Sequence, residues 1–243
     1  MILAAGHGTR LRPLTDNLPK PLVRFQGKPL LEIIIERLLF SGIEKIVVNI
    51  HHLADQVVEF LRLRDYYDGK VLISDETDRL MDTGGGVLKA RELLDDGEPF
   101  ILHNVDVYTN LDIKKLVAAH QENNAFITIA VKKRTPSRSL LFDEHNSLSG
   151  WQNNKTGEKK IIRDFKGDLT DYGNSCVYVI NPEFFRLVSN KEPVSLTELY
   201  LNLARTHPVK GFIHDKDYWY NLGLYDTFLK AEAEVTLNVN FDT

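Results

Sequence analysis

Over its first 132 residues this chain alternates short apolar runs with amphipathic segments, and this alternation most constrains the fold. Apolar runs of strand length fall at residues 1–5, 45–50, 70–74, 99–104 and 126–133, and segments with helical spacing of apolar residues fall at 29–41, 53–63, 84–94 and 111–122. We expect Asn110 to cap the last of these helices. Strands that alternate with helices predict βαβ units and a mostly parallel sheet.

The pattern changes after residue 132. Residues 137–180 hold short β-like runs separated by turn clusters, which is typical of antiparallel hairpins, and two further helices are expected at 195–205 and 225–236, with short strands at 209–215 and 218–222. No stretch is rich enough in Pro, Gly or Ser to mark a linker. The sequence predicts an α/β fold with a doubly wound, mostly parallel, Rossmann-like sheet and a small antiparallel insertion. We expect one domain over residues 1–243, with halves at 1–132 and 133–243.

Composition excludes several classes of protein. The net charge of −4 argues against a nucleic-acid-binding or membrane-surface protein, and no apolar run approaches the length of a membrane span. The single cysteine, Cys176, has no partner for an internal disulfide, which fits a reducing compartment. Because the chain starts in a strand with no basic leader, we expect a cytoplasmic protein. Its oligomeric state stays open.

A glycine-rich, basic loop follows the first strand, with the sequence GHGTR at residues 6–10. Leu11 stands where the dinucleotide-binding fingerprint needs a third glycine, and no Gly-Lys-Ser/Thr follows, so neither that fingerprint nor a P-loop is present. Glycine lets backbone N–H groups approach a ligand, and Thr9 and Arg10 add a hydroxyl and a guanidinium. These groups suit the oxygens of a triphosphate.

Two further charges point to phosphate chemistry. Lys20 has a proline on each side, which limits how far its ammonium can move. Asp106 follows the apolar run at 99–104, and a carboxylate facing phosphates needs a cation between them. Mg²⁺ suits that position, because it binds through one or two carboxylates together with phosphates and water.

The run AAGHGTRLRPLT, followed by PKPL, resembles the signature of the sugar-1-phosphate nucleotidyltransferases. The resemblance implies a Rossmann-like α/β fold and a reaction in which a nucleoside triphosphate and a sugar 1-phosphate are joined and pyrophosphate is released. It also implies nucleotide-binding and sugar-binding roles for the first and second halves. The implied triphosphate-binding residues are Ala5, Gly6, Gly8, Thr9, Arg10 and Lys20, of which Arg10 and Lys20 would be the catalytic cations.

The same resemblance implies a metal site. Asp106 corresponds to the metal-binding and catalytic aspartate of the family, although Val105 replaces the usual glycine before it. The second metal ligand of the family lies in a W-x-D-x-G-T segment, and here Asn221 stands in place of that aspartate. An amide oxygen can bind Mg²⁺ with less charge. Either the metal binds more weakly here or another acid helps.

The segment DTGGG at residues 82–86 bears on the choice of base. Three glycines at the start of a helix leave room for backbone contacts to the edge of a base, and in the family this segment reads the base, with Gly85 closest. Its form resembles the uridylyltransferases that act on N-acetylmuramate 1-phosphate, which predicts UTP and that sugar phosphate as substrates. The alternatives are a mannose- or heptose-1-phosphate guanylyltransferase, or a catalytically weak nucleotide-sensing homologue.

Two further features have open interpretations. Cys176 stands where the family has a glycine facing the sugar, so it either alters the choice of sugar or is a buried small hydrophobe. His51 and His52 follow the strand at 45–50 at its ligand-facing end. With no partner at ligand spacing they do not predict a zinc site, but a substrate contact by one of them is open.

Overall fold

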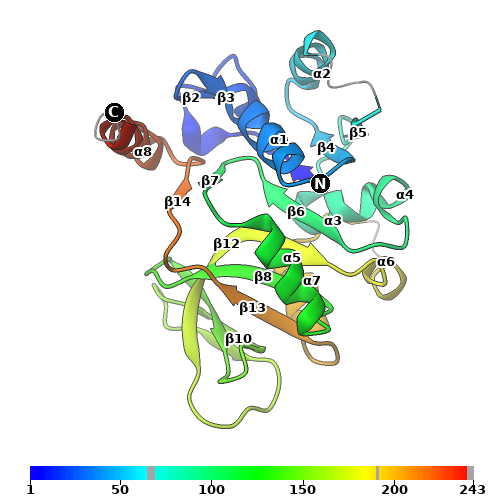
Figure 1. The fold of residues 1–243 in the computed structure, drawn as a ribbon, viewed down its shortest axis with the longest axis vertical. Coiled ribbons are helices and arrows are strands. Elements are labelled where there is room, and N and C mark those ends of the chain that lie inside the picture. Colours follow the sequence, from blue (N-terminus) through cyan, green and yellow to red (C-terminus); the bar gives the residue numbers. More distant parts are fainter. Residues whose placement is uncertain (65–68, 190–191, 240–243) are drawn as a thin grey trace. The chain divides into compact units, whose positions relative to one another are not determined.

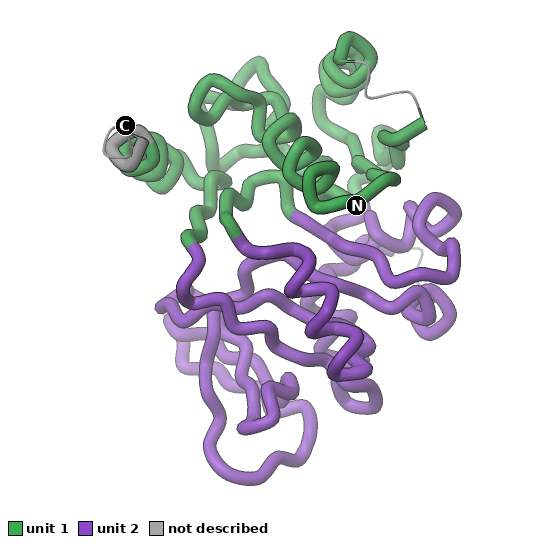
Figure 2. Tube along the Cα trace, viewed as in Figure 1, with its two compact units in different colours: residues 1–80, 104–110, 218–243 green, residues 81–103, 111–217 purple. Residues whose placement is uncertain are grey.

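The computed structural model describes residues 1–64, 69–189 and 192–239, and its chain divides into two compact units. Unit 1 comprises residues 1–80, 104–110 and 218–243, and unit 2 comprises residues 81–103 and 111–217, coloured green and purple in Figure 2. The single domain over residues 1–243, with halves that meet at residue 132, stays a prediction.

Unit 1 contains the first predicted parallel strands. Strands β1, β4 and β5 are parallel neighbours, with Leu3 opposite Asn49 and Val48 opposite Ile73. Residues of β1 and β4 are buried throughout, as expected for a parallel sheet covered on both faces. The elements of this part are β1 (Ile2–Leu3), η1 (Thr9–Leu11), η2 (Lys20–Leu22), β2 (Arg24–Phe25), β3 (Lys28–Pro29), α1 (Leu30–Phe40), β4 (Ile46–Ile50), α2 (Ala54–Leu63) and β5 (Val71–Asp75) (Figure 1).

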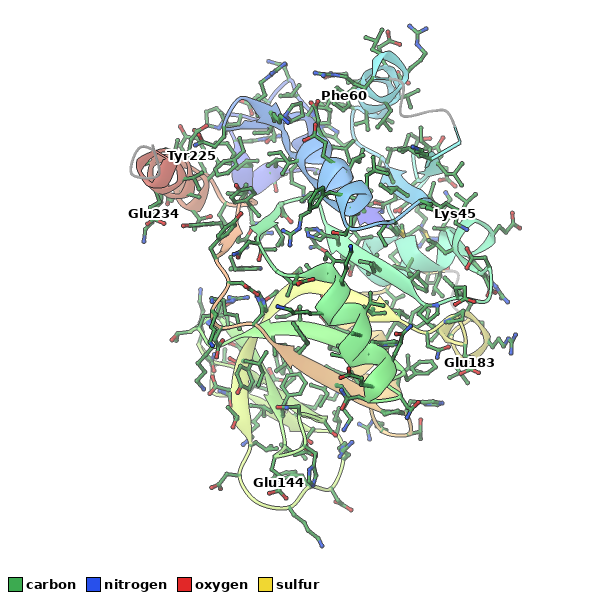
Figure 3. All side chains as sticks on the ribbon, in the orientation of Figure 1. Lys45, Phe60, Glu144, Glu183, Tyr225 and Glu234 are labelled. Carbon is green, nitrogen blue, oxygen red and sulfur yellow. The ribbon has the colours of Figure 1, made fainter. Side chains whose placement is uncertain are left out.

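Two later segments complete unit 1. Strand β7 (Val107–Thr109) pairs antiparallel with β14 (Trp219–Asn221), and α8 (Tyr225–Val239) follows β14. Aromatic rings tie these segments to the hairpin of β2 and β3, because the ring of Phe25 lies 4.9 Å from that of Tyr108 and 5.7 Å from that of Phe228. Tyr225 and Glu234 mark α8 in the side-chain view of Figure 3.

Unit 2 is built on a mixed sheet. Strand β12 (Thr170–Ile180) lies antiparallel between β6 (Phe100–Asn104) and β8 (Ile127–Lys132), and β13 (Val209–Ile213) pairs parallel with β8. The helix α5 (Ile113–Glu122) packs across β8, β12 and β13 (Figure 1). The remaining helices are α3 (Asp82–Lys89), α4 (Arg91–Leu94), α6 (Phe184–Leu187) and α7 (Leu196–Leu203).

The predicted antiparallel insertion is a three-stranded meander in unit 2. Its strands are β9 (Arg138–Phe142), β10 (Leu148–Asn153) and β11 (Lys159–Ile161), and β9 also pairs with the first residues of β12. The α/β class, with parallel strands and a small antiparallel part, is therefore confirmed.

Two details differ from the sequence prediction. The segment at 84–94 is not one helix, since α3 begins at Asp82 and the chain turns at Ala90 before α4. The cap of α5 is Asp112, whose side chain accepts a hydrogen bond from the Lys115 N–H at 3.1 Å. Asn110 instead accepts a hydrogen bond from the backbone N–H of Tyr218 at 2.8 Å, so it joins β7 to the segment before β14.

Candidate active site

The loop after β1 is shaped by its second glycine. Gly8 has φ +68°, a conformation that side chains disfavour, and its carbonyl accepts hydrogen bonds from the Leu11 N–H at 2.8 Å and the Thr15 hydroxyl at 2.8 Å. A Cβ at Gly8 would lie only 3.0 Å from the Thr15 methyl group and 3.2 Å from Cβ of Lys20. Glycine at this position lets the loop turn back against Lys20.

The base of this loop is fixed by a buried polar chain. The Ala4 N–H donates to Oδ1 of Asn49 at 2.6 Å, and Nδ2 of Asn49 donates to Oε1 of Glu76 at 2.6 Å. Ala5, also buried, follows directly and leads into Gly6. Sequence reasoning missed Asn49 and Glu76. A lone asparagine within the apolar strand β4 is the signal that could have found them, because a buried amide needs partners.

Lys20 and Asp106 form the central contact of unit 1. Nζ of Lys20 donates to Oδ2 of Asp106 at 3.1 Å, and the two side chains are only 14% and 10% exposed. The backbone around Lys20 is a 3₁₀ turn, in which Pro21 is buried and Lys20 carbonyl accepts from the Val23 N–H at 3.2 Å. The ammonium is thus held on a stiff segment beside a buried carboxylate.

Charges around Asp106 keep it ionised. Burial raises the pKa of this carboxyl group, but the charge and hydrogen bond of Lys20, the backbone N–H of Asp106 and the charge of Arg10 together outweigh burial, so its pKa lies below the usual value. The stability that this shift contributes is present above the unfolded-state pKa of the group and is lost as the pH falls through the folded-state pKa. Arg10 and Thr9 are exposed on η1, with Arg10 close enough to act on Asp106.

Asp106 and Asn221 meet above Gly223. A Cβ at Gly223 would overlap Oδ2 of Asp106 and lie 3.0 Å from Oδ1 of Asn221, so only glycine leaves room for the two oxygens. Strand pairing sets this arrangement, because Asn221 lies opposite Val107, and the Leu222 N–H donates to the Asp106 carbonyl at 2.7 Å. Oδ1 of Asn221 also accepts a hydrogen bond from the Gly223 N–H at 2.9 Å.

These oxygens fit a Mg²⁺ ion that shares its shell with phosphates and water. One carboxylate and one amide oxygen converge, and the ammonium of Lys20 already occupies a cation position beside Asp106. No group of three or more His, Cys, Asp or Glu side chains that could hold a metal occurs among the residues that the structure describes. A metal at this position would therefore depend on oxygen atoms from the substrate.

The predicted base-reading glycines belong to unit 2, whereas the glycine loop and Asp106 belong to unit 1. They follow Asp82 and Thr83, the first two residues of α3, and Gly84, Gly85 and Gly86 are all buried. A Cβ at Gly84 would meet the Val194 carbonyl at 2.8 Å, and one at Gly85 would meet Cβ of Met81 at 2.9 Å. The N–H groups of Gly84 and Gly85 donate to the Val194 carbonyl at 2.9 and 3.1 Å. Close packing therefore explains these two glycines without a ligand.

Cys176 lies in a conformation that suits glycine. Its φ is +58°, and its N–H donates to Oδ1 of Asn174 at 2.8 Å, at a point where the pairing of β12 with β8 shifts register. A backbone built for glycine thus carries a cysteine, and the side chain is half-buried. The resemblance described above likewise predicts glycine at this position of the sequence.

The structure thus brings Gly6, Gly8, Lys20, Asp106 and Asn221 together in unit 1, at the carboxyl ends of β1 and β4 and beside the paired strands β7 and β14. Open parallel sheets bind ligands at the carboxyl ends of their strands. The fold and the site together define an α/β protein whose candidate ligand site combines a glycine loop, two cations and a carboxylate.

Comparison with known proteins identifies the family. The profile of the nucleotidyl transferase family matches residues 1–238, and the chain belongs to that family of enzymes.

None of the helices in the described part of the chain is long and apolar enough to cross a membrane.

Two curated relatives are similar to this chain over most of its length. An N-acetylmuramate α-1-phosphate uridylyltransferase of Caulobacter vibrioides is 44% identical, covering 97% of this chain and 96% of its own length. A mannose-1-phosphate guanyltransferase of Yarrowia lipolytica is 32% identical over 95% of this chain, which spans only 62% of that protein.

Solved structures show the same fold at low identity. HddC of Yersinia pseudotuberculosis, solved with GMP-PN, has a TM-score of 0.76 and 24% identity, covering 96% of this chain and 97% of its own. A putative glucose-1-phosphate thymidylyltransferase of Bacillus anthracis has a TM-score of 0.78 and 15% identity, covering 96% of this chain and 92% of its own.

Proposed function

We propose that this chain transfers UMP from UTP to N-acetylmuramate 1-phosphate and releases pyrophosphate. One observation carries the reaction class: a stiffly held ammonium, Lys20, lies 3.1 Å from the ionised Asp106 beside a glycine loop. The relative that spans nearly the whole length of both chains at 44% identity supports the uridylyl and N-acetylmuramate parts. The single cysteine supports a reducing, cytoplasmic setting.

Electrostatics and positioning perform the proposed reaction. The phosphate of a sugar 1-phosphate is largely dianionic near neutral pH, so it is already a nucleophile and needs no general base. Its oxygen attacks the α-phosphorus of UTP, the bond from that phosphorus to the β-phosphate oxygen breaks, and the electron pair leaves with pyrophosphate. The barrier comes from repulsion between anions and from charge on the leaving group.

In this proposal each residue of the site has a role in the reaction. The backbone at Gly6 and Gly8 admits the triphosphate close to the loop, with Ala5 and Thr9 flanking these glycines. The charges of Arg10 and Lys20 stabilise the negative charge that grows on the departing pyrophosphate. Asp106, with Asn221, would hold Mg²⁺, which when bound supplies charge neutralisation across phosphate oxygens.

Base selection by Gly85 is part of the proposal. Its support is the resemblance of the DTGGG segment to the family segment that reads the base, since the packing of α3 by itself accounts for glycine at this position. A site that pairs with the edge of uracil rejects bases whose donors and acceptors are reversed, because unpaired buried polar groups cost about 1–3 kcal/mol each.

A panel of nucleoside triphosphates tests this proposal. With N-acetylmuramate 1-phosphate as common acceptor, kcat/KM from pyrophosphate release should favour UTP over GTP, CTP and ATP by about tenfold to several hundredfold. A preference for GTP with mannose 1-phosphate would instead support the second candidate, which the 32% identical guanyltransferase favours. Nucleotide binding without pyrophosphate release would indicate a sensing homologue and overturn the enzymatic proposal.

A further inference from the structure

Three histidines meet beside the glycine loop of unit 1. The ring of His7 lies 5.2 Å from the ring of His51, edge to face, and 5.3 Å from the ring of His52. His7 stands between the two loop glycines, whereas His51 and His52 directly follow β4. Parallel pairing of β1 with β4 explains the meeting, because Leu3 lies opposite Asn49 and both strands end at the same edge.

The cluster adjoins the groups proposed to bind phosphate. A Cβ on Gly6 would lie 3.7 Å from Nζ of Lys20, so the residue before His7 passes directly over that ammonium. His7 itself is exposed, and His51 and His52 are half-buried. An anion seated on the backbone of residues 6–8 would therefore have Lys20 and an accessible imidazole within one residue of its position.

One hydrogen bond fixes the chemistry of His51. Its Nδ1 lies 2.7 Å from the backbone carbonyl of Glu76, which can only accept, so Nδ1 carries a proton. In the neutral ring the other nitrogen, Nε2, then carries the lone pair. The carboxylate of Glu76 accepts a hydrogen bond from Asn49, and Glu76 contacts His51 through its backbone carbonyl.

The rings repel one another when charged. Burial, followed by the charges of His51 and His52, lowers the pKa of His7, so this ring resists protonation as long as no anion is near. Lys20, on η2, adds a further positive charge near Gly6. Imidazoles that resist charging because of neighbouring cations gain protons when a polyanion neutralises that repulsion.

We propose that His7, His51 and His52 form a subsite for the pyrophosphate portion of the nucleoside triphosphate and for released pyrophosphate, and that the cluster takes up protons as this anion binds. The inference rests on the proposed function, because it assigns these histidines to the leaving-group end of the same site. It makes the histidines binding residues for a polyphosphate anion and not metal ligands.

Isothermal titration of the protein with magnesium and inorganic pyrophosphate tests the subsite. Wild-type protein is compared with His7→Asn and His52→Gln at pH 6.0 and pH 8.5, and the ratio of Kd values at each pH cancels protonation of the ligand itself. We expect each substitution to weaken binding about tenfold at pH 6.0, where a charged imidazole contributes, and less than about twofold at pH 8.5. The matched control is His145→Gln, because this side chain is 78% exposed and lies in unit 2.

Titrations at pH 7 in two buffers of different ionisation enthalpy give a second readout. Wild-type protein should take up more protons per pyrophosphate bound than His7→Asn, whereas His145→Gln should match wild type. Equal proton uptake, or the same Kd ratio at both pH values, overturns the subsite. Lys20→Ala separates the two claims: if it weakens pyrophosphate binding while the histidine variants do not, only the subsite fails, and if pyrophosphate does not bind wild type, the proposed function fails as well.

Discussion

This chain has two sets of closely spaced glycines, and glycine is needed in each set for a different physical reason. In the loop after β1, Gly8 has φ +68° and Gly6 passes over an ammonium, with Nζ of Lys20 3.7 Å from where its Cβ would lie. In α3 the glycines are helical and buried, and Gly84 packs on the Val194 carbonyl. We expect the first set to open the backbone to a ligand, whereas the second lets α3 lie close to the segment before α7. A run of glycines in a sequence therefore predicts that other atoms closely approach the backbone there. Only the surrounding charges indicate whether those atoms belong to a ligand or to the protein itself.

The largest effect should come from the carboxylate beside the first set. Asp106→Asn removes the negative charge that Lys20 and Arg10 surround, and with it the proposed metal ligand. We expect kcat for pyrophosphate release to fall about 10³-fold, the upper end for loss of one preorganised charged contact. The control is Asp112→Asn, because asparagine caps a helix about as well as aspartate does. Activity within tenfold of wild type would remove Asp106 from the site.

The contrast between the glycine sets can be tested by paired substitutions. Gly84→Ala would place a Cβ 2.7 Å from Cδ1 of Leu199 and 2.8 Å from the Val194 carbonyl, so we expect the free energy of unfolding to fall by about 1–3 kcal/mol. The Cβ of Gly6→Ala would make only an ordinary contact, so we expect this variant to change the free energy of unfolding by less than about 0.5 kcal/mol while it lowers activity. Urea unfolding of both variants checks this. Equal stability loss at both positions would contradict the contrast.

A smaller effect is expected at the amide ligand. Asn221→Asp adds a carboxylate beside Asp106 and should shift the Mg²⁺ concentration for half-maximal activity downward several-fold, because charge strengthens binding of a hard cation. The Gly223 N–H can still donate to the new side chain, as it does to Asn221 at 2.9 Å. A magnesium titration of wild type and variant measures the midpoint. An unchanged midpoint would mean that residue 221 does not bind the metal.

Much of the fold could be predicted because the relevant signals are local. The helical spacing at 29–41 and 53–63 predicted α1 and α2 within a residue or two, and the β-branched run at 45–50 predicted β4. The predicted cap of α5, Asn110, was wrong because Asn110 and Asp112 are both good caps. The choice between them depends on the hydrogen bond of Asn110 with Tyr218, far along the chain. Likewise, the break at Ala90 between α3 and α4 carries no proline or glycine to mark it.

The site was predictable where a motif concentrates unusual residues and not where strand pairing assembles it. Lys20 between two prolines and Asp106 after an apolar run drew attention as separate features, but their contact joins residues 86 positions apart. The reason for glycine at 223 appears only once β14 pairs with β7 and brings that residue against Asp106. The histidine cluster similarly needs β1 beside β4. Roles in binding and catalysis for the predicted residues stay predictions until tested.

The central claim is that Lys20 and Asp106 work as one unit in phosphate chemistry, and a double-mutant cycle on kcat/KM for UTP tests it most directly. We expect Lys20→Ala to cost about 10² and Asp106→Asn about 10³, with the double variant near 10³, because removing either partner already disables the shared contact. Circular dichroism of all four proteins confirms that they are folded. A double variant that loses about 10⁵, the product of the two single effects, would show that the residues act independently and would contradict the account.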